Sequence, residues 1–305
     1  MVPVKNRATL VLRTLNSIKA QTWRPINIIV VDNASTDGTW DSVGQWIASN
    51  SAPDFQVSLE YEATPGAACA RNRGLEAVDT RLMMFFDSDD IMHPRHIERI
   101  MARFHTPDQP DLVYFRVLYH PIAGGDRITK KPGSDLMVTH ICHALFRTQG
   151  YACETALARR AGGWDSELGG WDDLEFGTRI FLEARNRAYI PDVNVEVFAR
   201  ADSITGTQFR SRRGEWEKAI EKMDSALEKS KNYQSLKWRK VLAYKKTILA
   251  ASYRREGDIG FGDSLMREVM NHELLNGYQK WFLRLVYKYA AMGGRGSASL
   301  INMFF

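Results

Sequence analysis

Cysteine is scarce in this chain of 305 residues, and long apolar runs are absent from it. The three cysteines, Cys69, Cys142 and Cys153, are too few and too scattered for a disulfide framework, which favours a reducing compartment. No stretch approaches the ~18 apolar residues that a membrane span needs, and no signal peptide is visible. These absences predict a cytoplasmic protein, or one that lies at the inner face of a membrane without crossing it.

Charge is distributed unevenly along the chain. Residues 206–305 hold 19 Lys and Arg against 10 Asp and Glu, a balance of +9, whereas residues 1–205 hold 22 against 26, a balance of −4. The split predicts one domain over 1–205 and a basic, mainly helical region over 206–305. A basic surface suits anionic lipid, nucleic acid or an acidic partner, and the simplest interpretation is an ordinary solvated helical surface.

The first ninety residues alternate between strand and helix patterns. "MVPVKN" predicts the end of a short strand whose beginning is expected before Met1, and further strands are predicted over 26–33, 57–63 and 81–87. Helices are predicted between them, over 7–22, 38–49 and 66–78. This order predicts an α/β fold with an open, mostly parallel sheet and helices on both faces.

The later part of the chain gives mixed signals and then helical ones. A strand is predicted over 111–120, a loop over 121–135, a helix from near Asp172, and helices from Gly214 onward. A final amphipathic stretch is expected to end at Gly293-Gly294 and carries Trp281, Phe282, Leu285, Val286 and Tyr289. It could pack on the other helices or lie in a membrane interface.

The stretch "FFDSDD" (85–90) places three carboxylates directly after an apolar run. In an extended segment Asp87 and Asp89 would face the same side and Asp90 the other. A D-x-D pair at a strand end is a good half-site for Mg²⁺ or Mn²⁺ that also holds a diphosphate. Alternatively the segment is a capped turn, with Asp90 capping a helix whose first turn contains Pro94.

Other polar residues fall near the ends of predicted strands and helices. Asp32 follows a buried strand, as Asp87 does, and ligands collect beyond the carboxyl ends of parallel strands, so both should share one crevice. Arg71 suits a phosphate or carboxylate, or else a surface ion pair. Asp173 could serve as a general base, or else as part of an acidic helix N-terminus. "HICH" (140–143) is interpreted as core or crevice lining, because no second cluster completes a metal site.

Taken together, these segments resemble the family 2 glycosyltransferases, which have the Rossmann-like GT-A fold. The matching segments are "PVKN", "VVDNASTDGT", "GAACARNRGLEAV", "FFDSDDIMHP", "GGWDSEL" and "WDDLEF", and the resemblance covers about residues 1–205. The chain departs from the family pattern at Lys5, where an aromatic residue is usual, at Asn33, where many members have Asp, and at Asp172, where Glu is common. The Asn33 departure leaves the nucleotide base open.

The resemblance implies a metal-dependent, inverting transfer from a nucleotide sugar, in the first place a UDP-sugar, to a hydroxyl of a saccharide or lipid-linked saccharide. Asp89 would hold Mg²⁺ or Mn²⁺, Asp173 would be the base, and Asp172 is the second candidate. The implied nucleotide-sugar-binding residues are Pro3, Val4, Asn6, Asp32, Asn33, Arg71, Asp87 and Ser88. A loop in "VFARADSIT" would bring Arg200 and Ser203 to phosphate. Such enzymes commonly serve surface polysaccharide or glycoconjugate synthesis.

Two further functions stay open beside it. A nucleotidyltransferase would need a Gly-rich phosphate loop near the N-terminus, which "VPVKNRATL" lacks. A catalytically inactive binding module with the same fold would not need the acidic residues that are present. Nucleic-acid binding through "KWRKVLAYKK" (237–246) is disfavoured, because its charges interleave with apolar residues at helical spacing.

Overall fold

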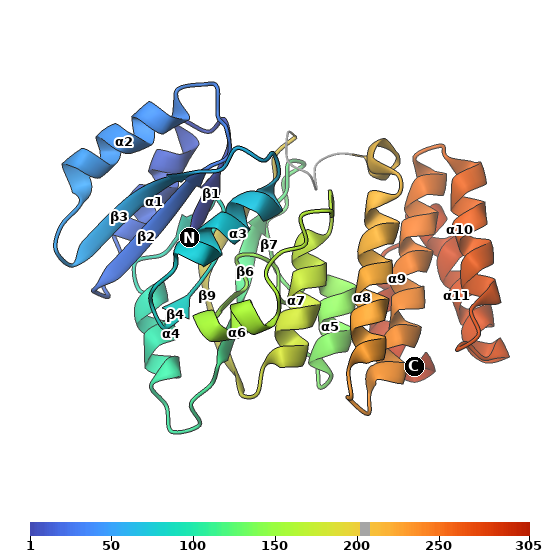
Figure 1. Ribbon diagram of the computed structural model, residues 1–305. Helices are drawn as coiled ribbons and strands as arrows, with labels where there is room; N and C mark the ends of the chain where they lie inside the picture. Colours follow the sequence, from blue (N-terminus) through green and yellow to red (C-terminus); the bar gives the residue numbers. More distant parts are fainter. Residues whose placement is uncertain (202–207) are drawn as a thin grey trace. The chain divides into compact units, whose positions relative to one another are not determined.

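The computed structural model describes residues 1–201 and 208–305, which form parts of two compact units (Figure 1). The first unit comprises Met1–Lys131, Leu145–Glu167 and Ile180–Ala201. The second comprises Pro132–Ala144, Leu168–Arg179 and Asp202–Phe305. Residues 132–144 and 168–179 therefore group with the C-terminal region by packing, and the domain boundary expected near residue 205 remains a prediction.

The first unit begins with a parallel sheet of three strands in the order β1-β2-β3. The strands are β1 (Val2–Val4), β2 (Ile26–Asp32) and β3 (Phe55–Tyr61), and the helices after them are α1 (Leu10–Lys19), α2 (Thr39–Asn50) and α3 (Ala67–Ala77). Figure 1 shows α3 in front of this sheet and α1 behind it. The predicted parallel sheet with helices on both faces is confirmed for this part of the chain.

The fourth predicted strand, over 81–87, is wrong in length and partner. The structure has β4 (Leu82–Met83), which pairs antiparallel with β8 (Tyr151–Glu154). After β4 the chain passes to the first sheet, where the main-chain nitrogen of Met1 donates to Met84 O at 3.0 Å and Phe86 N donates to Met1 O at 2.9 Å. Phe85 and Phe86 are buried as strand residues are, so their apolar character alone could not show the change of partner.

The second sheet is mixed, in the order β4-β8-β6-β9-β5, with β7 paired to β6. Its longest strands, β6 (Leu112–His120) and β9 (Arg187–Phe198), are parallel to each other, and the other pairs are antiparallel. The remaining elements of this unit are β5 (Ile91–Met92), α4 (His96–Phe104), β7 (Arg127–Ile128) and α6 (Thr155–Arg160). One continuous core contains residues from both sheets, for example Val30, Phe86, Val113 and Ile190.

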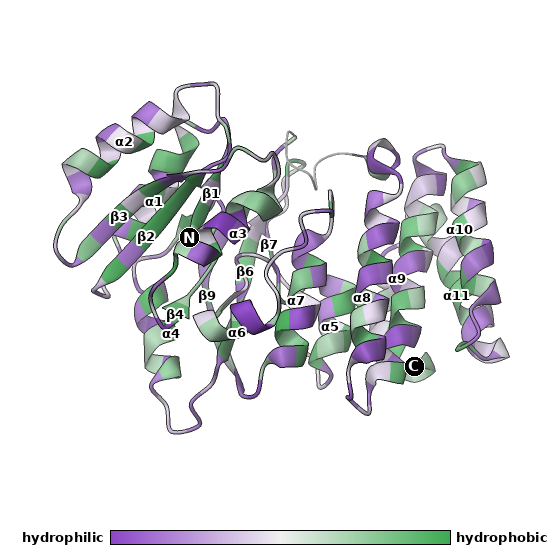
Figure 2. Ribbon diagram, in the orientation of Figure 1, coloured by the Kyte–Doolittle hydropathy of each residue, from purple (hydrophilic) through white to green (hydrophobic). Residues whose placement is uncertain are grey.

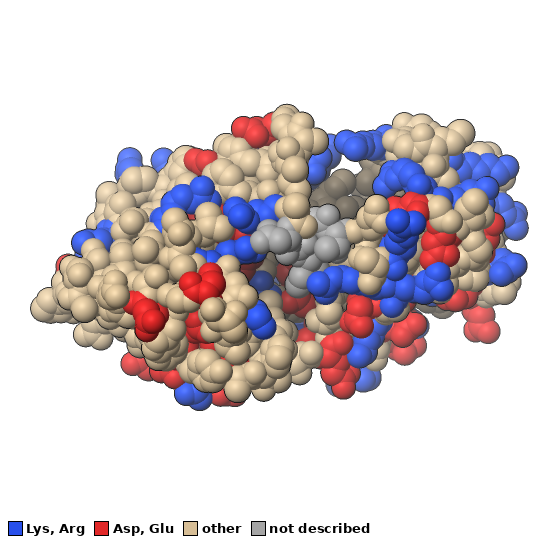
Figure 3. All heavy atoms as spheres, turned by 90° about the horizontal axis from the view of Figure 1, so that it is seen from above, with Lys and Arg blue, Asp and Glu red and all other residues tan. Residues whose placement is uncertain are grey.

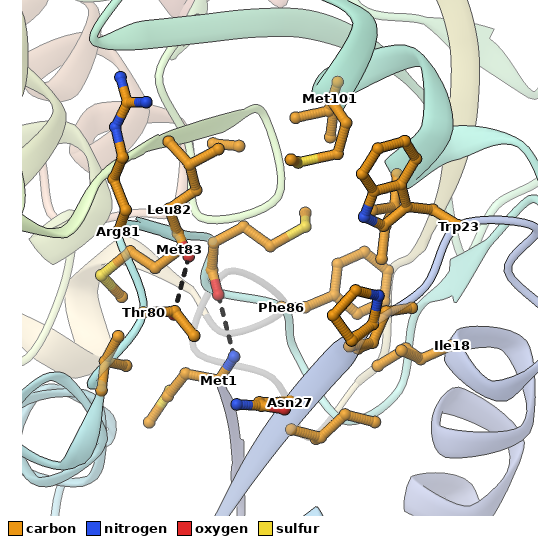
Figure 4. A pocket seen from close by; sticks show the side chains of 18 of the residues that line it. Met1, Ile18, Trp23, Asn27, Thr80, Arg81, Leu82, Met83, Phe86 and Met101 are labelled. Atoms are coloured by element: carbon orange, nitrogen blue, oxygen red, sulfur yellow. Dashed lines mark hydrogen bonds between the residues drawn. The ribbon is translucent and has the colours of Figure 1, made fainter. Parts of the chain in front are cut away.

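An apolar cavity of about 460 Å³ lies in this unit, lined by the first residues of β1 and β2, by residues 78–84 and by α4. Figure 4 shows Trp23, Met83, Phe86 and Met101 around it. The cavity is at the amino ends of the parallel strands, whereas ligands of such sheets bind beyond the carboxyl ends. Its mostly apolar lining also offers little to a diphosphate.

The second unit is helical, and α9 (Ser235–Arg255) packs against α5, α8, α10 and α11. Figure 2 shows that these helices alternate apolar and polar faces, which is the pattern of a helical bundle. The division between the units falls within α7. The other helices of the unit are α5 (Leu136–His143), α7 (Asp172–Glu183), α8 (Glu215–Lys229), α10 (Ile259–Asn271), α11 (Gly277–Ala291), α12 (Ile301–Phe304) and the 3₁₀ turns η2 (Phe209–Arg212) and η3 (Ser297–Leu300).

The end of α11 confirms the predicted helix stop. Asn276 caps its first turn by accepting a hydrogen bond from Gln279 N at 2.9 Å, and Gly293 follows the last turn with a φ of 90°. Glycine is suited to this left-handed position because it has no Cβ. None of the helices in the described part of the chain has both the length and the apolar character that crossing a membrane requires.

Candidate active site

The site is built around the carboxyl end of β1, where the direction of the chain connections reverses. β2 lies on one side of β1, and residues 84–86 lie on the other. Where the chain connections from two neighbouring strands run in opposite directions, the loops after the strands separate and leave a crevice for a ligand, called the topological switch point. Asp32 ends β2, and Asp87 follows the 84–86 segment. β2 and residues 84–86 are each one strand spacing from β1, so their ends lie roughly 10 Å apart on either side of Val4.

Asp32 is almost completely buried at this edge, with 1% of its surface exposed. Its Oδ1 accepts a hydrogen bond from Ser35 N at 2.8 Å, which shapes the turn after β2. Its Oδ2 is buried and has no hydrogen-bond partner. Leaving a buried carboxylate oxygen unpaired costs about 1–3 kcal/mol or more. An N–H donor supplied by a ligand would remove this cost.

Asn6 and Asn33 hold the loops beside Asp32 in place. Asn6 has a positive φ of 52°, accepts a hydrogen bond from Thr36 N at 2.8 Å and donates its own N–H to Ser35 Oγ at 2.9 Å. The Asn33 side chain donates to Glu62 O and Thr64 O and accepts from Gly66 N, at 2.7–3.0 Å. Main-chain partners thus occupy the Asn33 amide on both sides.

The main chain of β1 is also engaged next to these loops. Val4 O accepts a hydrogen bond from Asn33 N at 2.8 Å, and Pro3 is paired in register with Val31. The two residues reach the switch point through the strand itself, because β1 ends at Val4.

The acidic segment 87–90 is a turn, not an extended strand end. The N–H of Asp90 approaches Asp87 O at 3.4 Å, and Ser88 is buried within the turn. The expectation that Asp90 faces away from Asp87 is therefore wrong, because the i, i+2 alternation applies only to extended chain. The Gln149 amide donates to both carboxylates, to Asp87 Oδ2 and, at 2.5 Å, to Asp90 Oδ2.

Asp90 has a structural role that differs from the expected helix cap. It is 1% exposed, and its Oδ1 accepts a hydrogen bond from Phe198 N at the end of β9, at 3.0 Å. Its main-chain oxygen accepts from Thr14 Oγ1 at 2.8 Å. The helix that follows, α4, has no side-chain cap at its first turn. Asp90 therefore anchors the turn to α1 and β9.

Arg71 supplies the positive charge nearest to Asp87. Its Nη2 donates to Asp87 Oδ1 at 3.0 Å, and its guanidinium lies over the Trp164 ring at 4.3 Å. The Arg71 side chain is only 8% exposed, so the alternative of a surface ion pair is wrong, and the pair is largely buried. A partly desolvated pair of this kind fixes the orientation of the carboxylate.

The carboxylate of Asp89 is partly buried and lies among charges of both signs. Burial, and then the Asp87 charge, raise the pKa of Asp89, against the opposing charges of Arg7 and Arg200. Arg200 Nε lies 4.0 Å from Asp89 Oδ2. Burial, Asp87 and Asp89 raise the pKa of Asp90 well above its ordinary value. Such a cluster of carboxylates favours the approach of a further cation.

A cation at Asp89 would need ligands beyond protein side chains. Among the described residues there is no group of three or more His, Cys, Asp or Glu side chains able to hold a metal ion. Mg²⁺ and Mn²⁺ are commonly held by one or two carboxylates together with water and substrate phosphate. Asp89 fits that donor set.

Two motifs that are distant in sequence join behind Arg71. The Asn72 side chain donates to Trp164 O and accepts from Trp164 N, both at 2.8 Å. Gly163 has a φ of 69°, and a Cβ there would meet Asn72 Oδ1 at 2.8 Å. The glycine is thus required by both its conformation and the close approach, and the contact positions the ring on which Arg71 rests.

Asp172 and Asp173 belong to the second unit, in the first turn of α7. The helix starts where predicted, and acidic side chains in this turn suit the helix macrodipole. Trp171, before them, has a positive φ of 52° and packs edge to face on Trp216 at 5.3 Å. Lys245 Nζ lies 4.5 Å from the Trp171 ring centre. The start of α7 is therefore held by the packing of its neighbours.

Some predicted and unpredicted residues remain to be placed. His140 is fully buried, and its Nε2 is hydrogen-bonded to Leu174 O at 2.8 Å. His140 is therefore a core residue. Ser203 lies outside the described residues. Gln149 and Arg13, which donates to Asp89 O at 2.5 Å, were missed by sequence reasoning. Neither carries a local signal, since the tertiary fold alone brings them to the turn.

Comparison with known proteins identifies relatives of part of this chain. Residues 1–152 match the family model described as glycosyl transferase family 2. An uncharacterized glycosyltransferase of Nostoc sp. is 35% identical over 103 residues, 34% of this chain and 31% of the relative. Glycosyltransferase YibD of Escherichia coli is 31% identical over 102 residues, 33% of this chain and 28% of the relative. The match thus spans about a third of the length of these relatives.

Solved structures share the fold over most of the chain. S. aureus TarS 1–349 has a TM-score of 0.68 and 14% identity, with 96% of this chain and 89% of that chain covered. TarS 1–349 has also been solved in complex with UDP-GlcNAc. A mannosyltransferase from Pyrobaculum calidifontis, solved with GDP-Man and Mn²⁺, has a TM-score of 0.62 and 19% identity, with 96% and 84% covered.

Proposed function

Because the chain belongs to glycosyl transferase family 2, we propose that it moves a sugar from a nucleotide diphosphate donor to a hydroxyl group of an acceptor. The observation that carries the proposal is the edge of the first sheet. There the unpartnered Oδ2 of Asp32 and the acidic turn 87–90 flank the end of β1. A nucleoside base offers N–H donors to such a carboxylate, and a diphosphate brings oxygen ligands for a cation held by the turn.

The donor is in the first place a UDP-sugar. Asp32 Oδ2 would accept the single ring N–H of uracil, which pairs the buried oxygen. Arg71 would stay on Asp87, and that carboxylate, turned by the guanidinium and by Gln149, would meet the ribose. The residues proposed around the nucleotide sugar are Pro3, Val4, Asn6, Asp32, Asn33, Arg71, Asp87 and Ser88.

Asp89 is proposed to hold Mg²⁺ or Mn²⁺ together with the phosphate oxygens of the donor. A bound divalent cation would offset the charge that develops on the departing diphosphate. Asp89 is partly buried and its pKa is raised, which supports this role because a cation lowers the cost of ionising the carboxylate. The Mn²⁺ present with GDP-Man in the Pyrobaculum calidifontis enzyme is consistent with it.

Asp173 is proposed as the base of the reaction, and Asp172 as the second candidate. Its carboxylate would take the proton of the acceptor hydroxyl while the hydroxyl oxygen forms a bond to the anomeric carbon. The bond between that carbon and the diphosphate oxygen breaks in the same step. Attack from the face opposite the leaving group inverts the anomeric configuration.

The setting proposed for this reaction is the cytoplasm, with contact to the inner face of the membrane through the C-terminal region. The acceptor would be a saccharide or a lipid-linked saccharide, and the product a surface polysaccharide or glycoconjugate. Nucleic acid is not a proposed partner, because the segment 237–246 lies within α9 and its apolar residues Trp238, Val241 and Leu242 are buried in the helical unit.

A second candidate function is a nucleotide-binding module without turnover. The same edge would bind the donor, but no sugar would be transferred. A nucleotidyltransferase stays less favoured, because the segment after β1 lacks the glycines of a phosphate-binding loop. Binding and turnover must therefore be measured separately.

The test is a thermal-shift titration with UDP, GDP and their sugars, with and without Mn²⁺, followed by an assay of UDP release. We expect a Mn²⁺-dependent rise in Tm with UDP, because a ligand of the folded state stabilises it. Asp89→Asn should abolish the Mn²⁺-dependent part and lower turnover by at least about 10³-fold. Asp54→Asn, at an exposed carboxylate, is the matched control and should change neither. A folded protein that binds none of these nucleotides would contradict the proposal, and binding without turnover would favour the binding module.

A further inference from the structure

We propose that α11 and the residues after it form a docking surface for anionic lipid headgroups. The surface is an apolar stripe on one side of the helix, with basic side chains beside it. It is made of residues in the second unit alone, which are Tyr278, Trp281, Leu285, Tyr289 and Met292. This inference rests on the proposed membrane location and not on the proposed reaction, because lipid binding is measured without donor, metal or acceptor.

The stripe is a continuous exposed face. Its members are spaced by three or four residues, so they project from one side of α11. Each exposes between 46% and 81% of its surface. Isolated exposed apolar residues are normal on proteins, but an aligned set of five on one helix marks an interaction surface.

The stripe is not the face by which α11 packs into its own unit. The buried side of the helix carries Gln279, Phe282, Leu283, Val286 and Ala290, and it meets α9 and α10. Both faces contain large apolar side chains, yet only one of them is covered. The expected amphipathic stretch thus contains residues of both kinds, since Phe282 and Val286 are buried while Trp281, Leu285 and Tyr289 are exposed.

The aromatic rings of the stripe are fixed by their neighbours. Tyr278 stacks on Trp281 at 5.8 Å and on Phe304 of α12 at 4.9 Å. Phe304 in turn stacks on buried Phe282 at 3.8 Å. At the other end, Tyr289 donates its hydroxyl to Arg295 O at 3.1 Å. The side chains are therefore held outward, and little conformational freedom remains to be lost on docking.

The charge around the stripe selects an anionic partner. Residues 276–305 contain no Asp or Glu, whereas they contain Lys280, Arg284, Lys288 and Arg295. Arg284, Lys288 and Arg295 are exposed. Figure 3 shows Lys and Arg side chains at the right-hand end of the molecule, with some Asp and Glu side chains among them. Basic side chains beside exposed Trp and Tyr are the composition of helices that lie in the headgroup region of a membrane.

A second copy of the chain fits this surface less well. Two such faces brought together would place Arg284 and Lys288 near their own counterparts with no acidic side chain from this segment to pair them. Like charges in contact oppose association. An anionic bilayer offers both the missing negative charge and an apolar layer for the rings.

The experiment is co-sedimentation of the full chain with vesicles of phosphatidylcholine alone or with 40% phosphatidylglycerol. We expect binding to the anionic vesicles that weakens as salt is raised. Trp281→Gln with Leu285→Gln should lower the partition coefficient at least about tenfold, and Arg284→Gln with Lys288→Gln about fivefold for each charge. Tyr233→Gln with Leu236→Gln, two exposed apolar residues elsewhere in the same unit, should leave it unchanged.

Four results would overturn the inference. Equal binding to both vesicles would remove the charge selection, and binding to neither would remove the lipid as the partner. Equal loss in the Tyr233/Leu236 control would show that the effect is not specific to the stripe. Self-association of the wild type that the Trp281/Leu285 variant lacks, seen by sedimentation without vesicles, would identify the stripe as a contact between copies. Intact Tm and UDP release in the variants would separate all of these from failure of the proposed function.

Discussion

The edge of the first sheet and the exposed face of α11 depart from the usual arrangement of residues in opposite ways. At the edge, the carboxylates of Asp32 and Asp90 are almost completely removed from water. On α11, Trp281 and Leu285 remain half exposed to it. Folded proteins ordinarily bury apolar side chains and expose charged ones, and the informative exceptions are buried polar groups and exposed apolar patches.

Different interactions hold the buried carboxylates of the edge and the exposed side chains of α11. Buried Asp90 is held by hydrogen bonds from Gln149 and from Phe198 N, and its neighbour Asp87 by an ion pair with Arg71, so removing one partner leaves a charge without compensation. The exposed stripe is held only by ring stacking and by the helix behind it. The edge should therefore be sensitive to single substitutions, and the stripe tolerant of them.

The largest effect is expected at a charge that lies outside both regions. Asp173→Asn should lower kcat by about 10³-fold or more with KM little changed, because an amide cannot accept the hydroxyl proton. Its neighbour provides the matched control, and Asp172→Asn should cost less than about tenfold. Steady-state kinetics with a UDP-sugar measures kcat and KM of both variants, and Tm shows whether each variant is folded. If Asp172→Asn proves the more damaging, the roles of the two residues are exchanged.

At the buried edge, Arg71→Met should lower the free energy of unfolding by about 2–3 kcal/mol. The change leaves Asp87 beside Asp89 and Asp90 without its cation, and the loss of one partner of a mostly buried pair is strongly destabilising. Urea unfolding measures the change. Adding Asp87→Asn should recover part of it, since the unpaired charge is then gone. An additive double variant would show that the two residues do not interact in solution.

The sequence was sufficient to predict which residues lie at the edge of the first sheet wherever this depends only on the position of a residue along a strand. Asp32 and Asp87 each follow an apolar segment, and the β-α-β order brings both to the switch point at β1. It was insufficient where the chain leaves regular structure. The turn at 87–90 directs Asp87 and Asp90 to one amide, and Gln149 comes from a loop some sixty residues away. No pattern in either segment indicates that contact.

The same limit explains α11. The sequence predicted an amphipathic helix and its end, because these depend on local periodicity and on Gly293. It could not tell which of Trp281, Phe282, Leu285 and Val286 would be buried, because that depends on the position of α9. Likewise, Leu82 and Met83 looked like part of one long strand, and only the pairing with β8 decided otherwise.

A buried histidine in the first unit tests whether burial disfavours a positive charge as it disfavours the negative charge of a carboxylate. His96 is 2% exposed and packs edge to face on Phe115 at 4.5 Å. Burial, with smaller effects of His93 and Arg99, lowers the pKa of His96 to about 3. Below about pH 6.5 the unfolded chain takes up a proton that the folded chain refuses, so stability falls as the pH falls, by up to about 1.4 kcal/mol for each unit.

His96→Phe should therefore flatten the dependence of stability on pH between 6.5 and 3. Urea unfolding at several pH values measures the slope, and His105→Phe, at an exposed histidine, should leave it as in the wild type. Equal slopes in the wild type and in His96→Phe would mean that His96 takes up its proton in the folded protein.

The smallest effect is expected on the exposed stripe. Leu285→Gln should change the free energy of unfolding by less than about 0.5 kcal/mol, because about half of the residue, 46%, is already exposed to water. Leu283→Gln, the same chemical change two residues earlier, should cost about 3 kcal/mol or more, since Leu283 is fully buried and the amide would lack partners. Chemical unfolding of both variants gives the difference directly. If Leu285→Gln costs as much as Leu283→Gln, the stripe contributes to folding, and its exposure would no longer mark it as a surface kept for another molecule.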